Sequence, residues 1–111
     1  MYESEALNYI MTQKAYAAEI ALTTAYSELD SCHYENCAMA SGKRAYIGAV
    51  ACPREIELGT RVNIDGTWYV CEDRYQKDLS YRFDIFFGYA TEAHQAAKEY
   101  GRKELLVFIE N

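Results

Sequence analysis

Short runs of alternating hydrophobic and polar residues, separated by turn residues, follow one another from residue 20 onward. Runs of this kind that are rich in valine, isoleucine, threonine and aromatic residues predict β-strands. The predicted strands are Ile20–Tyr26, Ala45–Ala51, Thr60–Ile64, Thr67–Cys71, Tyr81–Phe87 and Glu104–Ile109. Six short strands with one helix before the last of them predict a mainly β domain, folded as a small closed or nearly closed barrel.

Glycine and proline mark the turns between these strands. The dipeptide Asp65-Gly66 supplies the positive φ angles of a tight type I′ hairpin turn. Gly48 permits a bend within its strand, and Pro53 ends that strand. The polar segments predicted to be loops are Ser27–Asn36 and Asp73–Ser80.

The N-terminal segment has the spacing of an amphipathic helix. From Tyr2 to about Ala18 most residues are good helix formers, and Leu7, Ile10 and Met11 fall on or near one face. We therefore divide the chain into a helical extension, residues 1–18, and a barrel domain, residues 19–111. The extension is expected to pack on the outside of the barrel or to join copies of the chain into a homo-oligomer.

A second helix is predicted before the last strand. It spans Glu92–Tyr100, with Thr91 as its N-cap and Gly101 in the C′ position that stops it.

Composition and charge exclude several classes of protein. The 111 residues suffice for one domain with one core. The net charge of −6, with scattered lysine and arginine, argues against a nucleic-acid partner. No apolar run approaches the roughly 20 residues needed to span a bilayer, and the N-terminus lacks the pattern of a signal peptide.

The four cysteines are Cys32, Cys37, Cys52 and Cys71. An even number in a small chain is typical of an exported domain with two disulfides. Of the three pairings we prefer Cys32 with Cys37, which closes a loop, and Cys52 with Cys71, which joins two strands. Free buried thiols in a reducing cell are the alternative. The spacing differs from that of zinc sites, so we expect no metal.

Four segments in the C-terminal two thirds of the chain form a recognisable set. G-A-V-A-C-P-R-E-I-E-L-G-T-R-V runs from Gly48 to Val62, Y-V-C-E-D ends at Asp73, and R-F-D-I-F-F contains Asp84. The fourth, E-A-H-Q-A-A-K-E-Y-G-R-K-E-L-L-V-F-I, holds the second helix and the last strand. Together they resemble the three-aspartate (3D) domain family, with its signature G-x-V-A-V-D-P-x-x-I-P-L-G-T-x-V followed by segments that hold its second and third aspartates.

The resemblance implies a small six-stranded double-psi β-barrel, similar to the C-terminal part of membrane-bound lytic transglycosylase A and to the stationary-phase survival proteins. In the family, the aspartate that matches Asp84 is the proposed acid and base for cleaving the glycan strands of peptidoglycan. The resemblance therefore implies a cell-wall lytic enzyme, located in the cell envelope or outside the cell, that acts on peptidoglycan or a related glycan without a cofactor.

Two positions depart from the family pattern. Cys52 stands where the family has its first aspartate, and the segment from Arg74 to Tyr81 lacks the threonine and two glycines usual there. The alternative function is therefore a catalytically inactive barrel that serves as a glycan-binding or assembly module.

Asp84 is the principal candidate for catalysis. It lies among phenylalanines, and burial there would raise the pKa of its carboxyl group, as an acid–base role requires. Asp73 is the second candidate catalytic carboxylate. The candidate substrate-binding residues are basic and aromatic side chains of two predicted loop regions, namely Lys43, Arg44, Arg74, Tyr75 and Tyr81.

Overall fold

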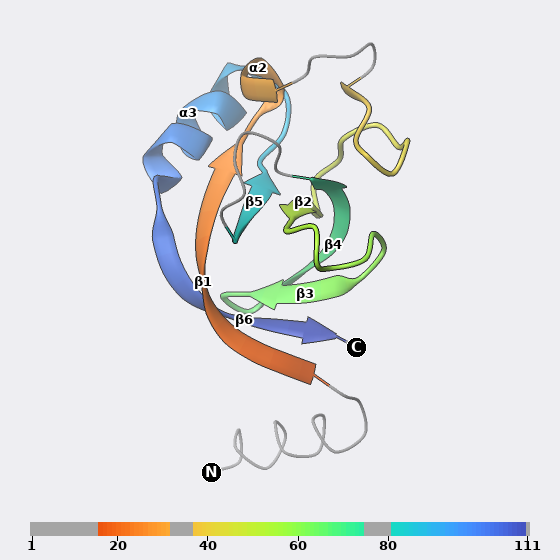
Figure 1. The fold of residues 1–111 in the computed structure, drawn as a ribbon. Helices are drawn as coiled ribbons and strands as arrows, with labels where there is room; N and C mark the ends of the chain where they lie inside the picture. Colours follow the sequence, from red (N-terminus) through yellow and green to blue (C-terminus); the bar gives the residue numbers. More distant parts are fainter. Residues whose placement is uncertain (1–15, 32–36, 75–80, 111) are drawn as a thin grey trace.

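Six strands and two helices make up the part of the chain that the structure, a computed structural model, describes: residues 16–31, 37–74 and 81–110 (Figure 1). The strands are β1 (Tyr16–Tyr26), β2 (Ala49–Cys52), β3 (Arg61–Ile64), β4 (Thr67–Arg74), β5 (Arg82–Phe86) and β6 (Lys103–Glu110), and the helices are α2 (Glu28–Ser31) and α3 (Ala90–Tyr100). The strands close into a barrel in the order β1-β5-β2-β4-β3-β6. The predicted mainly β, six-stranded barrel with one helix before its last strand is confirmed.

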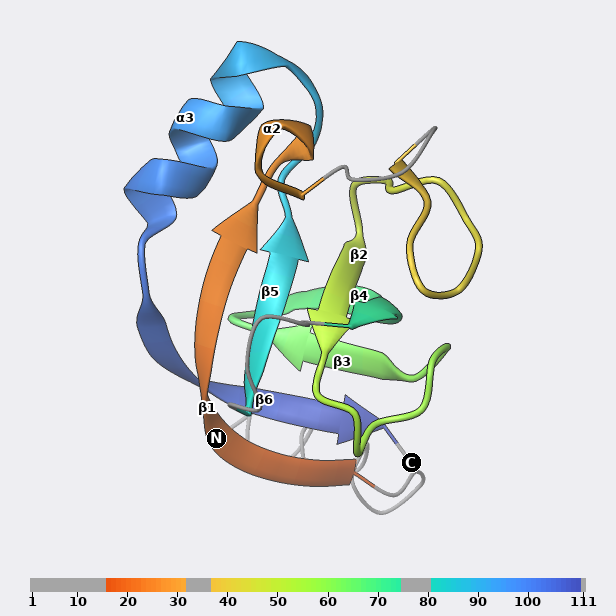
Figure 2. The same ribbon diagram turned by 45° about the horizontal axis from the view of Figure 1, so that its top comes forward.

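The barrel contains both parallel and antiparallel pairs of neighbouring strands. The pairs β1–β5 and β2–β4 run parallel, whereas the other four neighbouring pairs run antiparallel. Figure 2 shows β1, β5 and β2 side by side in one wall. Parallel neighbours need crossover connections instead of hairpins, and this mixed closed barrel fits the double-psi fold that the 3D-like motifs implied.

Strand alternation divides the apolar side chains between two clusters. Phe83 and Ile85 of β5 point into the barrel, together with Val50, Cys52 and Cys71 from the facing strands. The outer cluster lies on the other face of the same wall, where residues 37–48, the covering segment, pack over it. Its members are Tyr26, Met39, Ala45, Ala49, Ala51 and Phe86. The wall formed by β1, β5 and β2 is therefore covered on both faces.

The two helices lie together at one end of the barrel, and α3 packs against β1 (Figure 1). The Thr23 hydroxyl of β1 lies 2.8 Å from the Tyr100 hydroxyl at the end of α3. Neither helix of the described residues has the length and apolar character needed to cross a membrane.

Strand β1 begins at Tyr16, so the helical prediction is wrong for residues 16–18. Residues 16–19 pair with residues 107–110 of β6, and these inter-strand hydrogen bonds override the local preference for helix. The rest of the predicted extension, residues 1–15, lies outside the described residues, as does its expected role in association.

Other element boundaries also differ from the prediction. Strand β2 begins at Ala49 instead of Ala45, because the Ala45 amide bonds to the Cys37 carbonyl at 3.0 Å in the covering segment. Strand β4 continues through Asp73, which pairs with Ala51 of β2 and is not in a loop. The predicted loop after Tyr26 contains the one-turn helix α2.

The start of α3 differs from the prediction, whereas its end and the hairpin turn are as predicted. Thr91 is not the N-cap of α3, because the helix begins at Ala90, whose amide donates to the Glu28 carboxylate at 2.8 Å. Gly101, with a φ of 68°, ends the helix as predicted. Asp65 and Gly66, with φ of 53° and 89°, form the predicted hairpin turn between β3 and β4.

Cys52 and Cys71 form the predicted disulfide between neighbouring strands, with Cα atoms 5.7 Å apart. Both side chains are fully buried in the barrel interior. Cys37 is also disulfide-bonded. Its predicted partner, Cys32, lies outside the described residues.

Candidate active site

Four residues, one from each of the neighbouring strands β1, β5, β2 and β4, lie in register with one another as a row. Thr24 of β1 pairs with Asp84 of β5, Asp84 pairs with Ala51 of β2, and Ala51 pairs with Asp73 of β4. Residues in register share a face of the sheet, so the two aspartates flank the small Ala51 side chain on the outer face. Two strand spacings of about 4.8 Å place their Cα atoms roughly 10 Å apart.

A β-bulge produces this arrangement. Val50 pairs with Cys71, but the next residue of β2, Ala51, pairs with Asp73, so that Glu72 is the extra residue of β4. Without the bulge, Glu72 would stand opposite Ala51. The bulge therefore decides which carboxylate shares the row with Asp84.

Asp84 is a buried carboxyl group with one hydrogen bond. It is 9% exposed, and the Thr24 hydroxyl donates to its Oδ1 at 2.8 Å. No other hydrogen bond reaches Asp84 from the described residues, which leaves Oδ2 available to a ligand. Burial raises the pKa of Asp84 to about 6, against the opposing effects of Thr24 and Arg82 and with a contribution from the charges of Asp30 and Asp73.

The raised pKa of Asp84 predicts that stability falls as the pH rises from about 4 to about 6. The folded state binds this proton more tightly than the unfolded state, so ionisation of Asp84 favours unfolding. Asp84→Asn keeps an acceptor for Thr24 and removes the charge. We expect the variant to be more stable than the wild type at pH 7 by on the order of 3 kcal/mol, and equally stable below pH 4, in urea unfolding series. Equal pH dependence for both proteins would contradict the buried, proton-binding carboxyl group.

Asp73 has the contacts of a residue that holds backbone in place. Its Oδ1 accepts hydrogen bonds from the amides of Arg74, at 2.8 Å, and of Ala40, at 3.0 Å. The second contact ties the covering segment to β4. Asp73 therefore holds the backbone beside this row in place and contributes a negative charge near Asp84.

Glu72 anchors the same segment from the bulge. Its side chain is almost fully buried, and it accepts hydrogen bonds from the Tyr46 hydroxyl at 2.5 Å and from Lys43 Nζ at 3.2 Å. Burial acts to raise the pKa of Glu72, but the hydrogen bonds from Tyr46, Ser41 and Lys43 outweigh it and lower the pKa. Glu72 therefore remains charged and holds Lys43, a predicted substrate-binding residue, in an ion pair.

The Tyr26 hydroxyl is a buried polar group that lies beside Asp73 but makes no hydrogen bond of good geometry in the described part of the chain. Its ring packs against Phe86, with centroids 5.2 Å apart. Burial, followed by the charges of Asp73 and Asp84, raises the pKa of Tyr26. The hydroxyl therefore stays neutral and is kept near both carboxylates by packing.

Tyr26→Phe is expected to leave stability unchanged or to raise it by about 1 kcal/mol, because it removes an unsatisfied buried hydroxyl. Tyr89→Phe is the matched comparison, since Tyr89 also lies 5.2 Å from Phe86 but donates its hydroxyl to the Ala45 carbonyl at 2.6 Å. That variant should lose about 1 kcal/mol. Urea unfolding measures both, and an equal loss from the two changes would show that Tyr26 makes a hydrogen bond in solution.

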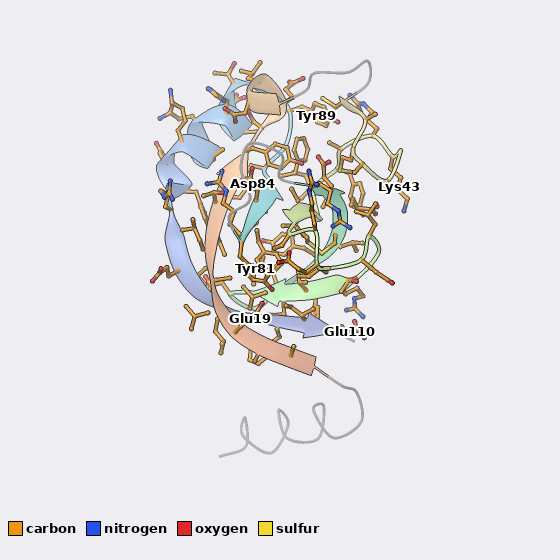
Figure 3. The ribbon with its side chains drawn as sticks, viewed as in Figure 1. Glu19, Lys43, Tyr81, Asp84, Tyr89 and Glu110 are labelled. Carbon is orange, nitrogen blue, oxygen red and sulfur yellow. A yellow bond between two sulfur atoms is a disulfide. The ribbon has the colours of Figure 1, made fainter. Side chains whose placement is uncertain are left out.

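The predicted substrate-binding residues do not all gather at Asp84. Tyr81 precedes β5 and donates its hydroxyl to Glu19 of β1, at the opposite end of β5 from Tyr89 (Figure 3). Arg74 pairs with Cys52 and donates to the Pro53 carbonyl at 3.2 Å, on the other face from Asp73. Tyr75 lies outside the described residues.

Lys43 and Arg44 belong to the segment that covers the outer cluster, and Lys43 is mostly exposed at its edge (Figure 3). Arg44 lies over the Tyr89 ring, 4.3 Å from the centroid. Of the predicted binding residues that the structure describes, these two are therefore the ones on the side of the outer cluster, the face of the wall that holds Asp84.

Two neighbours of Asp84, Thr24 and Tyr26, were missed from sequence, as was Glu72, which anchors the segment before β2. Thr24 and Tyr26 read only as strand residues, and their place beside Asp84 depends on a parallel pairing with no local signal. The position of Glu72 depends on the bulge.

Ser27, Asp30 and His94 form a second polar cluster where α2 meets α3. The Ser27 hydroxyl lies 3.0 Å from His94 Nδ1, and Asp30 lies 3.5 Å from the same nitrogen. Because both contacts use one ring nitrogen, His94 cannot relay a proton from serine to aspartate as in a catalytic triad. Asp30 accepts the Ser27 amide at 2.8 Å, so the cluster caps α2.

The described residues include no group of three or more His, Cys, Asp or Glu side chains placed to hold a metal ion. The geometry defines a closed mixed β-barrel with a buried, proton-binding carboxyl group on one covered wall. Among solved structures, the chain is similar to the crystal structure of MltA from E. coli, with a TM-score of 0.56 and 21% sequence identity. The similar region covers 71% of this chain and 28% of MltA, and the likeness shows the fold. No family model and no curated protein matches the sequence.

Proposed function

We propose that this chain is a peptidoglycan lytic enzyme of the lytic transglycosylase type, with Asp84 as its acid and base. The observation that carries the proposal is the Asp84 carboxyl group, which is buried, has a pKa raised to about 6, and has one oxygen without a hydrogen bond among the described residues. The barrel shared with MltA supports it, since the sequence motifs resemble those of the lytic transglycosylase family.

The chemistry needs one carboxyl group that acts first as a general acid and then as a general base. Protonated Asp84 donates its proton to the glycosidic oxygen as the bond from that oxygen to the muramic acid C1 breaks. The Asp84 carboxylate then accepts the proton of the muramic acid C6 hydroxyl, whose oxygen bonds to C1 and closes a 1,6-anhydro ring. No water is consumed. A pKa near 6 keeps both forms of Asp84 populated close to neutral pH.

Asp73 supports this chemistry from the side. Its Oδ1 is occupied by two backbone amides, so we assign it a positioning role and leave the proton transfers to Asp84. Cys52 supplies no carboxylate at the position of the family's first aspartate, and its disulfide with Cys71 braces β2 against β4 instead. The disulfide also supports a location in the cell envelope or outside the cell, because cytosolic thiols are kept reduced.

The experiment that tests this function is incubation of the protein with purified sacculi, followed by mass spectrometry of the soluble products. We expect 1,6-anhydro ends on the released muropeptides. Reducing ends would indicate ordinary hydrolysis, which needs a second catalytic carboxyl group. Release of neither product would remove the enzyme proposal.

A second candidate function, a non-catalytic glycan-binding or assembly module, is favoured by exposed apolar side chains. Ile20 of β1 and Leu106 of β6 are paired neighbours that are 66% and 45% exposed, and Trp68 of β4 is 38% exposed. Exposed apolar groups of this kind mark contact surfaces. Binding to sacculi without any product would support this module over the enzyme.

A further inference from the structure

Arg44 differs from its neighbour Lys43 in having no anionic partner in the part of the chain that the structure describes. Lys43 is neutralised by the buried Glu72 carboxylate at 3.2 Å. Arg44 is exposed, and among the described residues its guanidinium makes neither an ion pair nor a hydrogen bond. Three cations were predicted to bind substrate. Lys43 is neutralised by Glu72 and Arg74 lies on the other face of β4, whereas the charge of Arg44 is not neutralised by any described residue.

The Arg44 guanidinium is held in place by an aromatic support. It stacks 4.3 Å from the centroid of the Tyr89 ring, and the Tyr89 hydroxyl donates to the Ala45 carbonyl at 2.6 Å. Tyr89 packs edge-on against Phe86 at 5.2 Å. Phe86 follows Asp84 by two residues on the same strand face, so the support connects Arg44 to the face of β5 that holds Asp84.

A stacked guanidinium with open donors is suited to a carboxylate. Its planar fork donates two parallel hydrogen bonds to the two oxygens of such a group, and stacking on an aromatic ring fixes the orientation of the fork beforehand. The N-acetylated sugars of a glycan backbone carry no charge. Peptidoglycan carries carboxylates on the peptide that is joined to the lactyl group of muramic acid, and on the lactyl group itself where no peptide is attached.

We propose that Arg44 is the specificity-determining residue of this site, and that it binds a carboxylate carried by the muramic acid substituent of the glycan strand. This inference rests on the proposed function. It restricts the substrate to glycans with muramic acid and excludes neutral N-acetylglucosamine polymers as equal ligands. Lys43 contributes to the shape of the covering segment through Glu72 and not to ligand charge.

The test measures binding by Asp84→Asn protein, which should hold glycan strands without cleaving them. The probes are three glycans of matched length: peptide-bearing peptidoglycan strands, strands stripped of peptide by an amidase, which frees the lactyl carboxylates, and N-acetylglucosamine oligomers. Isothermal titration calorimetry gives Kd for each. The further changes are Arg44→Gln and Arg44→Lys.

The matched control is Arg61→Gln. Arg61 also stacks on an aromatic ring, 4.6 Å from the centroid of Trp68, but it is already paired with Glu110 at 3.4 Å and lies on β3, away from Asp84. Its loss removes the same charge and the same kind of ring contact. Thermal unfolding of each variant monitors the fold.

We expect Arg44→Gln to raise Kd about tenfold for carboxylate-bearing strands, as for the loss of a charge-assisted hydrogen bond, and to leave the neutral oligomer unaffected. Arg44→Lys should raise Kd about threefold, and Arg61→Gln should leave it unchanged. An effect on peptide-bearing strands alone identifies a peptide carboxylate. An effect on stripped strands alone identifies the lactyl carboxylate, which is free only there, and an effect on both shows that Arg44 accepts either carboxylate.

An equal weakening for the neutral oligomer, or no effect on any glycan, would overturn the role of Arg44 and leave the proposed function standing. Failure of the Asp84→Asn protein with native Arg44, and of the wild type, to bind any of the three glycans would overturn both.

Discussion

Asp84→Asn is expected to lower the release of anhydromuropeptides from sacculi by about 10²- to 10⁴-fold, the usual contribution of a general acid–base group. The asparagine keeps an acceptor for the Thr24 hydroxyl at the same place, so that the row across the wall is retained. What it loses is the proton that must reach the glycosidic oxygen and the carboxylate that must take the next one. Mass spectrometry of the products over time measures the rate.

The matched control is Asp65→Asn, in the exposed turn between β3 and β4. It makes the same chemical change, and asparagine tolerates the positive φ of 53° found there. Equal release of product by the wild type and Asp84→Asn would remove Asp84 from the mechanism, whatever the effect on stability.

Replacement of Cys52 and Cys71 by alanine is expected to lower the free energy of unfolding by roughly 3 kcal/mol. The disulfide closes a loop with a sequence separation of 19 residues, and its loss restores chain entropy to the unfolded state. Both sulfurs lie in the barrel interior, so some packing is lost as well. Urea unfolding of the variant and the wild type measures the difference.

Cys52→Val with Cys71→Ala separates the two effects, because valine restores part of the buried volume while the cross-link stays absent. A loss near 3 kcal/mol in both variants assigns the effect to the cross-link. A loss below about 1 kcal/mol in both would mean that the unfolded chain gains little freedom from breaking this bond.

The fold was predictable because its signals are local. Alternation of apolar residues located all six strands, Asp65-Gly66 located the hairpin, and Gly101 located the end of α3. The errors fell where tertiary pairing outweighs local preference. Residues 16–18 have helical propensity but extend β1 through pairing with β6, and Asp73 lies in β4 because β2 pairs with it.

The candidate site was predictable only in part. The motif around Asp84 identified the carboxyl group, and its aromatic flanks indicated the burial that raises its pKa. The partners of Asp84 come from strands that are distant in the chain. The register that pairs Thr24 with Asp84 cannot be inferred from the sequence of either strand alone. Arg74 was assigned to the site as a loop residue, but its place on a strand turns it to the other face.

The pairing of β1 with β6 affects how the barrel can be inserted into a longer chain. Tyr16, the first residue of β1, is the register partner of Glu110, the last residue of β6. The two ends of the barrel therefore meet at one corner, and a host chain can enter and leave there without disturbing the strands. The same closeness makes the barrel a candidate for circular permutation, with a short linker across this corner and new termini opened at the exposed turn between β3 and β4.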